Sequence, residues 1–437
     1  MNPDETIAPA PPATGFAAWR GYRHYVLAVV TLVYVINYLD RQILNILLPL
    51  IQKEFHLTDA ALGFLSGTVF AVMYAVLGVP LAIFADRMNR RNIIAGSLAL
   101  FSAMTIFCGL AAQFWQLLLA RLGTGVGEAG TGPSINSLIA DYYPTERRAT
   151  ALSFYSAGLN IGLLIAFFGG GWIAQKYGWR PAFLVAGVPG LIVTFLVLFT
   201  VREPMRGQAD NIADTGATPH ILDVIKLLWS RRSFRWISLG AALNAFGGYA
   251  AVAFLPLFLT VSHHLQPLYI GIALALLTGI PGAIGTFMSG VFSDRFARRD
   301  PGHIMVPPMI GVLIAVPFQP IVYLSPNLAI ALAAAIVPAL MGAIYVGPGL
   351  AATQALVPLR MRAQAVALFL FVLNIIGLGL GPLVTGKISD LLKPALGSDS
   401  LRWALLTSVI SGSMAAFCYW RSTKSLRDDI QRGQSAT

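Results

Sequence analysis

The sequence is poor in cysteine, histidine and charge. It has two cysteines and six histidines among 437 residues, and only 11% of its residues are charged. The two isolated cysteines, Cys108 and Cys418, give no disulfide framework. Soluble domains carry about twice this charged fraction. The composition therefore excludes an ordinary soluble globular protein.

Motifs of hydrolytic and nucleotide-driven proteins are missing as well. The chain contains no H-E-x-x-H, no G-x-S-x-G and no glycine-rich loop followed by Lys-Ser or Lys-Thr. Its densest glycine run, GTGVGEAG at 123–130, lies inside an apolar segment and is no phosphate loop. We therefore expect neither an enzyme nor a metal, and no cofactor beyond a proton gradient as the driving force.

What the chain has in abundance is long apolar segments. Hydrophobic residues make up 56% of it, and windows of about 18 or more residues with few charges are typical of membrane-spanning helices. We predict an all-α polytopic membrane protein with twelve transmembrane helices in two pseudo-symmetric six-helix halves. The predicted spans are residues 24–52, 60–86, 92–112, 114–141, 149–175, 180–201, 236–262, 268–293, 304–324, 327–357, 363–392 and 401–420.

The net charge of +11 follows the predicted topology. If both termini are cytoplasmic, the cytoplasmic segments hold 22 of the 30 lysines and arginines, and the outer segments hold six. This bias is the positive-inside pattern, so a nucleic-acid partner is not expected. We predict an integral protein of the inner membrane with cytoplasmic termini, in contact with membrane lipids.

The longest polar connection, residues 202–235, divides the chain into halves and includes a predicted amphipathic helix at 219–229. The predicted organisation is a disordered cytoplasmic N-terminus, a six-helix bundle, this linker, a second six-helix bundle and a cytoplasmic tail. The corresponding ranges are 1–23, 24–201, 202–235, 236–421 and 422–437.

The two halves resemble each other in sequence. AIFADRMNRR (82–91) matches GVFSDRFARR (290–299) at five of ten positions, and RATALSFYSAGLNI (148–161) matches RAQAVALFLFVLNI (362–375) at six of fourteen. The offsets of 208 and 214 residues are nearly equal, which indicates one duplication. Two repeats that enclose a midplane site are typical of secondary transporters.

Twelve spans in two repeats, with D-R-x-x-R-R after spans two and eight, resemble the major facilitator superfamily over residues 24–421. The stretch RLGTGVGEAG (121–130) resembles the R-x-x-x-G-x-G motif of that family's fourth span. Ala82 and Asn89 replace the two glycines that the first D-R block usually has. NYLDRQIL (37–44), the glutamate of GVGEAG (125–130) and VREPMRG (201–207) are similar to the spinster family, which implies a lysolipid or sphingosine-1-phosphate transporter.

Four charged side chains are predicted deep inside the spans: Asp40, Arg41, Arg121 and Glu128. From the helical rise per residue, Arg41 lies roughly 18 Å and Glu128 roughly 21 Å from the outer ends of their spans, at nearly the same level. Arg121 precedes Glu128 by two turns and shares its face. We expect all four to line a central cavity, because buried charges must neutralise one another. A helix-pairing ion network without a ligand is the alternative.

The chemistry of these side chains suggests their roles. Arginine is permanently charged and its planar fork fits phosphate or carboxylate, so Arg41 is predicted to bind the substrate headgroup. Asp40 lies about 100° around the helix from Arg41 and need not face the same wall. We predict that Glu128 or Asp40 exchanges a proton, and that protonation of the acid frees arginine for the anionic substrate. The histidines all fall at span ends or in loops and are poor proton carriers.

The second half has no deep charge. Its isolated polar groups include Asn244, Tyr249, Tyr345 and Asn374, among several phenylalanines, and we predict that these four contribute to substrate binding. A cavity that is charged on one wall and apolar on the other suits an amphipathic ligand with an anionic head and a long tail.

The repeated charged blocks are predicted to gate the cytoplasmic side. In the superfamily, the aspartate of each block meets a helix terminus and cations across that face, and a carboxylate is favoured at a helix N-terminus. Topology alone would explain the arginines but not the repeated aspartate. The predicted gating residues are Asp86, Arg87, Arg90, Arg91, Asp294, Arg295, Arg298, Arg299, Glu146 and Arg148.

Together these features favour a monomeric secondary active transporter that moves an anionic lysolipid by alternating access, coupled to protons. Two alternatives stay open. A proton-coupled transporter of small organic anions would want cationic side chains in both halves, and a receptor or scaffold without transport would show no flux.

Overall fold

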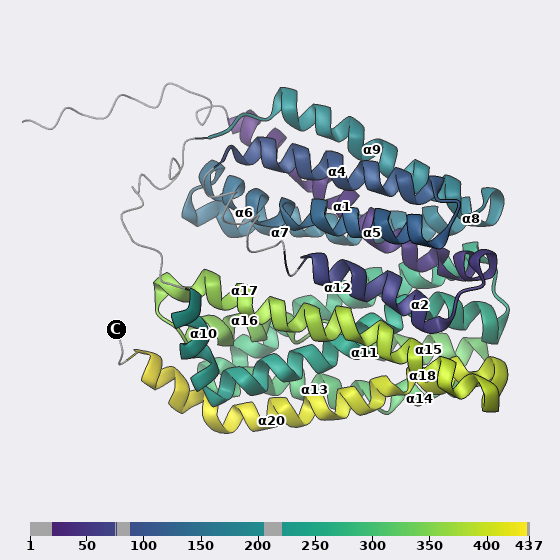
Figure 1. The fold of residues 1–437 in the computed structure, drawn as a ribbon. Coiled ribbons are helices and arrows are strands. Elements are labelled where there is room, and N and C mark those ends of the chain that lie inside the picture. The colour runs from purple at the N-terminus through teal and green to yellow at the C-terminus, as the bar shows by residue number, and fades with distance from the viewer. Residues whose placement is uncertain (1–19, 75, 77–87, 205–220, 435–437) are drawn as a thin grey trace, which may run out of the picture.

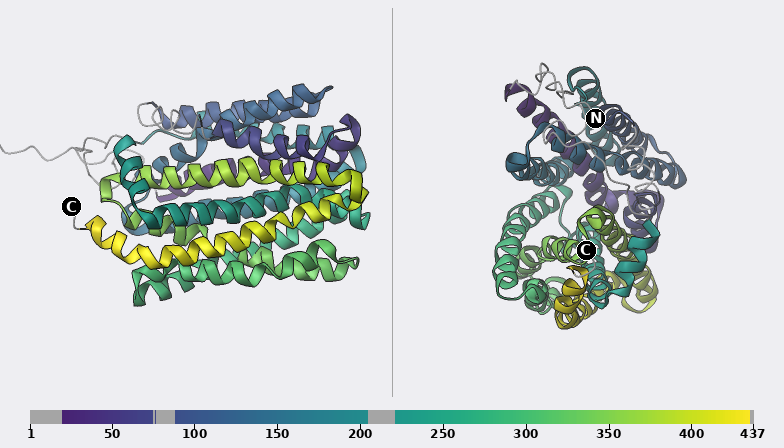
Figure 2. Two further views of the ribbon diagram at one scale, coloured as in Figure 1. Left: turned by 60° about the horizontal axis from the view of Figure 1, so that its bottom comes forward. Right: turned by 90° about the vertical axis from the view of Figure 1, so that its left-hand side faces the viewer.

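The computed structural model describes residues 20–74, 76, 88–204 and 221–434 (Figure 1). Every regular element in these residues is a helix. The helices form two bundles that lie side by side, and Figure 2 shows them separately in its end-on view. Residues 1–19, part of the predicted disordered N-terminus, lie outside the described residues.

The first half contains six spans, three of which are divided in the described residues. Breaks occur near Gly130 and around two short π-helical segments. The elements are α1 (Arg20–Phe55), α2 (Asp59–Gly63) with η1 (Phe64–Thr68), α4 (Arg90–Leu110), α5 (Phe114–Ala129) with α6 (Thr131–Tyr142), α7 (Thr145–Leu164) with η2 (Ile165–Gly169) and α8 (Gly170–Tyr177), and α9 (Trp179–Thr200).

The second half follows an amphipathic connecting helix, α10 (Ile221–Ser230), which packs on the bundle through Val224 and Leu228. Its elements are α11 (Arg232–His263), α12 (Pro267–Arg299), η3 (Pro301–Met305) with α13 (Val306–Ala315) and α14 (Phe318–Leu324), α15 (Leu328–Met341) with α16 (Val346–Ala355), α17 (Arg362–Leu373) with η5 (Asn374–Leu380) and α18 (Gly381–Leu396), and α19 (Ser400–Leu405) with α20 (Thr407–Gln434).

The predicted all-α fold with twelve spans is confirmed. Among the described residues, nine continuous helices are long and apolar enough to cross a membrane, and the ninth, residues 362–432, contains two spans. The second and fourth spans complete the twelve. The second runs into residues that are not described, and the fourth is divided between α5 and α6. Helix α20 continues to Gln434, so the predicted tail beyond residue 421 extends the last span as a helix.

The two halves meet mainly at one end of the molecule. We call the end with Arg20 and Gln434 the terminal end and the opposite end the distal end; in Figure 1 they lie left and right. At the distal end α2 packs against α18, and α8 and η2 pack against α12. These contacts are backbone to backbone. A Cβ added at Gly63 would overlap the carbonyl of Pro382, and one added at Gly271 would overlap that of Phe167.

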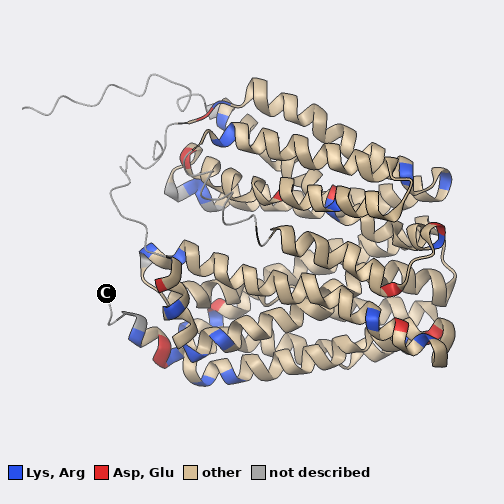
Figure 3. Ribbon diagram, in the orientation of Figure 1, with Lys and Arg blue, Asp and Glu red and all other residues tan. Residues whose placement is uncertain are grey.

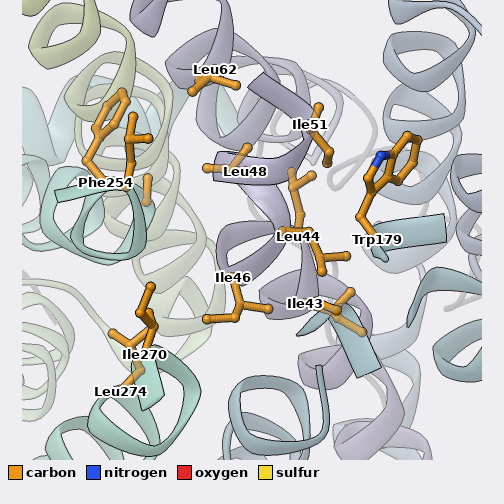
Figure 4. Packing of buried hydrophobic residues seen from close by; sticks show 14 of the residues in the cluster. Ile43, Leu44, Ile46, Leu48, Ile51, Leu62, Trp179, Phe254, Ile270 and Leu274 are labelled. Atoms are coloured by element: carbon orange, nitrogen blue, oxygen red, sulfur yellow. The ribbon is translucent and has the colours of Figure 1, made fainter. Parts of the chain in front are cut away.

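An apolar cluster fills the space behind these distal contacts. It joins Ile43 and Ile46 of α1 to Phe254 of α11 and to Ile270 and Leu274 of α12, so it includes residues of both halves (Figure 4). Burial of such side chains excludes water from the contact between helices. The distal end is therefore closed in this conformation.

Three π-helical segments interrupt the spans: η1 in span two, η2 in span five and η5 in span eleven. A π-turn leaves backbone carbonyls without their usual helical partner and often marks a functional position. Here η1 packs against η5 across the two halves. The hydroxyl of Thr68 donates to the carbonyl of Gly379 at 2.6 Å, which supplies one of these carbonyls with a partner.

Candidate substrate-binding site

Arg41 and Glu128 form an ion pair in the middle of the first half. Arg41 lies on α1 and Glu128 in the last turn of α5, and Arg41 Nη1 is 3.4 Å from Glu128 Oε1. The two side chains are 16% and 14% exposed, so both are partly accessible, and Arg41 also lines a small pocket. The guanidinium also lies over the ring of Phe70, with Cζ 4.5 Å from the centroid. With a single long contact to Glu128, the arginine keeps donors for an anionic ligand.

The second half contains a cavity of about 330 Å³. Its walls come from α11, α12 and the spans that follow them, and no charged side chain is among the described residues that line it. Its few polar groups include Asn244, Tyr249, Gln319 and Tyr345. A volume in this range with mostly apolar walls is typical of a small-molecule or lipid-chain site.

Tyr249 connects the apolar cavity to the charged pair. It lines the 330 Å³ cavity and also a smaller pocket that contains Arg41, Gln42 and Asn45 of α1 and Ser66 of η1. The charged wall in the first half and the apolar wall in the second half are therefore adjacent. A ligand that reaches both walls needs a polar head and an apolar body.

Asp40 and Arg121 do not join this site in the present conformation. Both side chains are buried within the first half, and neither lines the two cavities. Arg121 Nη1 donates to the backbone carbonyl of Asp40 at 3.4 Å, and the Asp40 carboxylate is enclosed near Thr105 of α4. The predicted cluster of four is thus split into a partly exposed ion pair, Arg41–Glu128, and a buried pair, Asp40 and Arg121.

Of the four polar residues predicted in the second half, three border the large cavity. Asn244, Tyr249 and Tyr345 line it, and Asn244 Nδ2 donates to the carbonyl of Gly342 at 3.4 Å. Asn374 begins η5, is half-buried and lines neither cavity.

Arg90 of the first charged block is held within its own half. Its buried guanidinium pairs with Asp141 at the end of α6 and, at 2.6 Å, with Glu203 after α9. The same side chain donates to the carbonyls of Ser137 and Pro204. Arg90 therefore ties three spans of the first half together in this conformation, and its gating role stays a prediction.

The other predicted gating residues are distributed around the terminal end. The Arg91 backbone N–H donates to Glu203 Oε2 at 2.9 Å, and Arg148 Nη2 donates to the carbonyl of Ala140 at 2.9 Å. Asp294, Arg295, Arg298 and Arg299 are exposed at the end of α12. Asp86 and Arg87 lie outside the described residues, as does the side chain of Glu146.

Several residues at the site were not singled out from the sequence. Tyr34, Tyr38 and Tyr155 pack together beside the charged pair. Tyr34 meets Tyr38 edge to face, with ring centroids 4.9 Å apart, and stacks on Tyr155, with centroids 4.3 Å apart. Gln42 and Asn45 also border it. The sequence did contain a signal for Gln42 and Asn45: two amides three residues apart inside an apolar span. Burying an unpaired amide in an apolar environment costs free energy, so such residues are candidates for a site.

Comparisons with known proteins identify the family. The model of the major facilitator superfamily matches residues 30–382. An "MFS-type efflux pump" of Mycolicibacterium smegmatis is 31% identical over 92% of this chain and 93% of its own length. "Protein spinster homolog 3" of Danio rerio is 27% identical over 98% of this chain and 90% of its own length.

A solved structure agrees with this assignment. The crystal structure of a bacterial homologue of the human lysosomal transporter Spinster, in an inward-facing and unoccupied conformation, is 32% identical, with a TM-score of 0.86 over 94% of this chain and 98% of that chain. The matched family model covers most of the chain, and the related proteins are transporters rather than enzymes. The chain therefore belongs to the major facilitator superfamily, as an integral membrane transporter related to the spinster proteins.

Proposed function

We propose that this protein transports an amphipathic, anionic lysolipid across the membrane by alternating access, driven by protons. The observation that carries the proposal is the junction at Tyr249, where the Arg41–Glu128 pair adjoins an uncharged cavity of about 330 Å³. Arg41 offers the planar donors that bind phosphate, and the apolar walls accommodate the chain. A small dianion would gain nothing from the uncharged wall.

We propose that the protein lies in the inner membrane and that its terminal end faces the cytoplasm. Most of its charged side chains are lysines and arginines (Figure 3). Basic residues are retained on the cytoplasmic side during insertion. Since the distal end is closed, the present conformation loads or releases substrate from the cytoplasm.

We propose that Glu128, the carboxylate that pairs with Arg41, couples transport to protons. While it is ionised it competes with the substrate headgroup for the guanidinium, and when it is protonated the guanidinium is available to phosphate. Proton uptake and headgroup binding are thereby linked at one ion pair. Asp40, which is buried behind this pair, is the second candidate.

Flux of radiolabelled oleoyl lysophosphatidic acid in proteoliposomes under an imposed pH gradient tests the proposal. We expect gradient-dependent flux in the wild type. Arg41→Ala should reduce it at least about tenfold, because a charged hydrogen bond to the headgroup is lost. Glu128→Gln should leave flux that no longer responds to the gradient.

Lys176→Ala is the matched control, because it removes a cation at the distal surface away from the two cavities. Lipid flux that neither Arg41→Ala nor Glu128→Gln changes would contradict the assigned roles. Absence of lipid flux in the wild type, with flux of a small organic anion instead, would establish the alternative substrate class.

A further inference from the structure

The distal part of α1 has one polar face. Gln42, Asn45 and Gln52 are three and seven residues apart, so they lie close to one line along the helix. Gln42 and Asn45 are buried in the part of the span between Arg41 and the distal end. Burial of an amide in an apolar environment is unfavourable unless its polar atoms are hydrogen-bonded.

The hydrogen bond between the two buried amides uses only part of their hydrogen-bonding capacity. Asn45 Nδ2 donates to Gln42 Oε1 at 2.7 Å, which uses one donor and one acceptor. Both residues line the smaller pocket, together with Arg41 and Ser66. This pocket has a volume of about 20 Å³, which is enough for one water molecule. Part of its lining is polar, and Arg41 belongs to both the pocket and the ion pair with Glu128.

Spans two and eleven meet along a line of contact between the two halves, which we call a seam. The smaller pocket lies beneath this seam. Ser66 comes from η1 of the first half, whereas Leu378 and Pro382 come from η5 and α18 of the second half. The Thr68–Gly379 hydrogen bond closes the same seam. If the two halves separate here, the pocket opens toward the distal side.

Nearer the distal surface, the seam ends in a group of hydrogen bonds between α2 and α18, which we call the latch. Asp390 of α18 accepts the backbone N–H groups of Asp59 and Ala60 at 2.9 and 2.8 Å, at the start of α2. Asp59 in turn accepts from Gln52 of α1 and from Ser389 of α18. The polar face of α1 thus continues from Arg41 through the amide pair to this latch.

The opposite seam, between spans five and eight, is apolar below its distal rim, where Gln175 bonds to Gln266 and Leu268. Ile43 and Ile46 of the same helix α1 point toward it and pack near Gly170 of α8. Ile270 and Leu274 of α12 belong to the same cluster (Figure 4). Helix α1 therefore separates a polar path on one side from an apolar path on the other.

We propose that Gln42, Asn45 and Ser66 form a second headgroup subsite, which takes a phosphate-bearing head from Arg41 when the seam between spans two and eleven opens. The lipid chain stays on the apolar side of α1. This inference rests on the proposed lysolipid transport and adds the route of the head and the residues that line it.

Side-specific transport tests the subsite. Uptake of radiolabelled oleoyl lysophosphatidic acid is measured in right-side-out and inverted membrane vesicles for the wild type and for the double variant Gln42→Leu/Asn45→Leu. We expect the half-saturating concentration from the distal side to rise roughly five- to tenfold, as for a lost hydrogen bond to a charged group. From the terminal side, where Arg41 is met first, it should stay unchanged.

Asn160→Leu is the matched control, because Asn160 is an intramembrane amide that lines neither cavity. An equal change from both sides in the double variant would mean that the amides only hold helices together. No change from the distal side would also overturn the subsite.

A second measurement does not depend on the substrate. Single cysteines replace Ser66 on the polar side and Ile270 on the apolar side, with Cys108 and Cys418 changed to serine. An anionic, membrane-impermeant methanethiosulfonate is added from the distal side while an imposed pH gradient drives transport. We expect labelling of Ser66→Cys and none of Ile270→Cys.

Absence of Ser66→Cys labelling, or equal labelling of both positions, would overturn the route. If the wild type carries no lysolipid while Ser66→Cys is labelled selectively, the lysolipid assignment fails and the polar route stands for another anionic headgroup. The two proposals can therefore fail separately.

Discussion

At the scale of single residues, the arginines of the first half have different environments. Arg41 keeps one long contact and borders a cavity, whereas Arg90 is buried and fully occupied by carboxylates and carbonyls. A guanidinium surrounded by several acceptors fixes the groups around it. Arg41 is thus arranged to exchange partners, and Arg90 to hold them.

Arg90→Ala should destabilise the protein without direct loss of substrate contacts. Removing one partner of a buried ion pair leaves uncompensated charge, so we expect the free energy of unfolding to fall by about 3 kcal/mol. The apparent Tm in detergent measures this effect. Arg91→Ala is the control, since the hydrogen bond from Arg91 to Glu203 uses the backbone N–H and survives the substitution. Equal Tm shifts in the two variants would contradict the role of Arg90.

The depth of the charged residues could be predicted from the sequence, but their direction could not. Rise per residue placed Arg41 and Glu128 at one level, and the structure brings them within 3.4 Å. Asp40 and Arg121 lie at similar depth but are turned into the bundle. Which side of a helix faces a cavity depends on the helices packed around it, and a single sequence with apolar residues on all sides does not specify them.

At the scale of elements, glycines at the distal end let the helices of opposite halves touch through their backbones. Gly63 and Gly386 pack at the seam between spans two and eleven, and Gly171 and Gly271 at the seam between spans five and eight. Small residues permit such close approach in membranes. The two seams are related by the same repeat that relates the halves.

Gly271→Ala should shift the protein toward a distal-open conformation. The added Cβ overlaps the Phe167 carbonyl, and overpacking of this kind costs about 1–3 kcal/mol. Spin labels at Ala112 and Pro326, on distal loops of the two halves, should show a larger population of long distances in pulsed electron paramagnetic resonance. Gly132→Ala serves as control, because a Cβ there meets no atom within 4 Å. Unchanged distance distributions would show that the seam relaxes without opening.

Asp390→Asn should loosen the latch at the other seam. The substitution removes the charge and one of two acceptors at the start of α2, worth about 1–2 kcal/mol. We expect severalfold faster distal labelling of Ser66→Cys. The control is Asp399→Asn, because Asp399 is exposed and pairs with Arg402 of its own half. If both variants label at the wild-type rate, Asp390 does not hold the seam.

The π-helical segments could not have been predicted. The apolar pattern places span eleven at residues 363–392, and the structure has helix from Arg362 to Leu396. The pattern does not indicate that Asn374–Leu380 changes its hydrogen-bond register. That change depends on Thr68, which is 311 residues away in the sequence from its acceptor Gly379. Local sequence determines that a helix forms, and tertiary contacts determine where it is distorted.

At the scale of the whole molecule, the twelve-span fold was accessible from the sequence. Hydropathy and internal repetition sufficed for it, because every span must satisfy its backbone hydrogen bonds within the membrane. The closure of the distal end could not be predicted from the sequence. A transporter that opens to one side and then to the other uses the same spans in both conformations.

The orientation is testable by fusions. Green fluorescent protein placed after Thr437 should fluoresce in bacterial cells, because it folds in the cytoplasm. Alkaline phosphatase inserted at Pro326 should be active, because the proposed orientation places that loop outside. The basis is the basic terminal end (Figure 3). The reverse pattern, with a dark fusion and an inactive phosphatase, would invert the assignment of the two ends.

The latch has a consequence for the energetics of the transport cycle. Asp390 bonds to the first N–H groups of α2, and Gln175 accepts the N–H of Leu268 at the start of α12. In both cases a side chain of one half caps a helix of the other at the distal rim, where bulk water begins. When the halves part, water can hydrate these helix starts at once, so each broken bond is exchanged rather than lost. The hydrogen bonds at the distal rim can therefore define the closed conformation without lowering its free energy so far that the halves cannot separate.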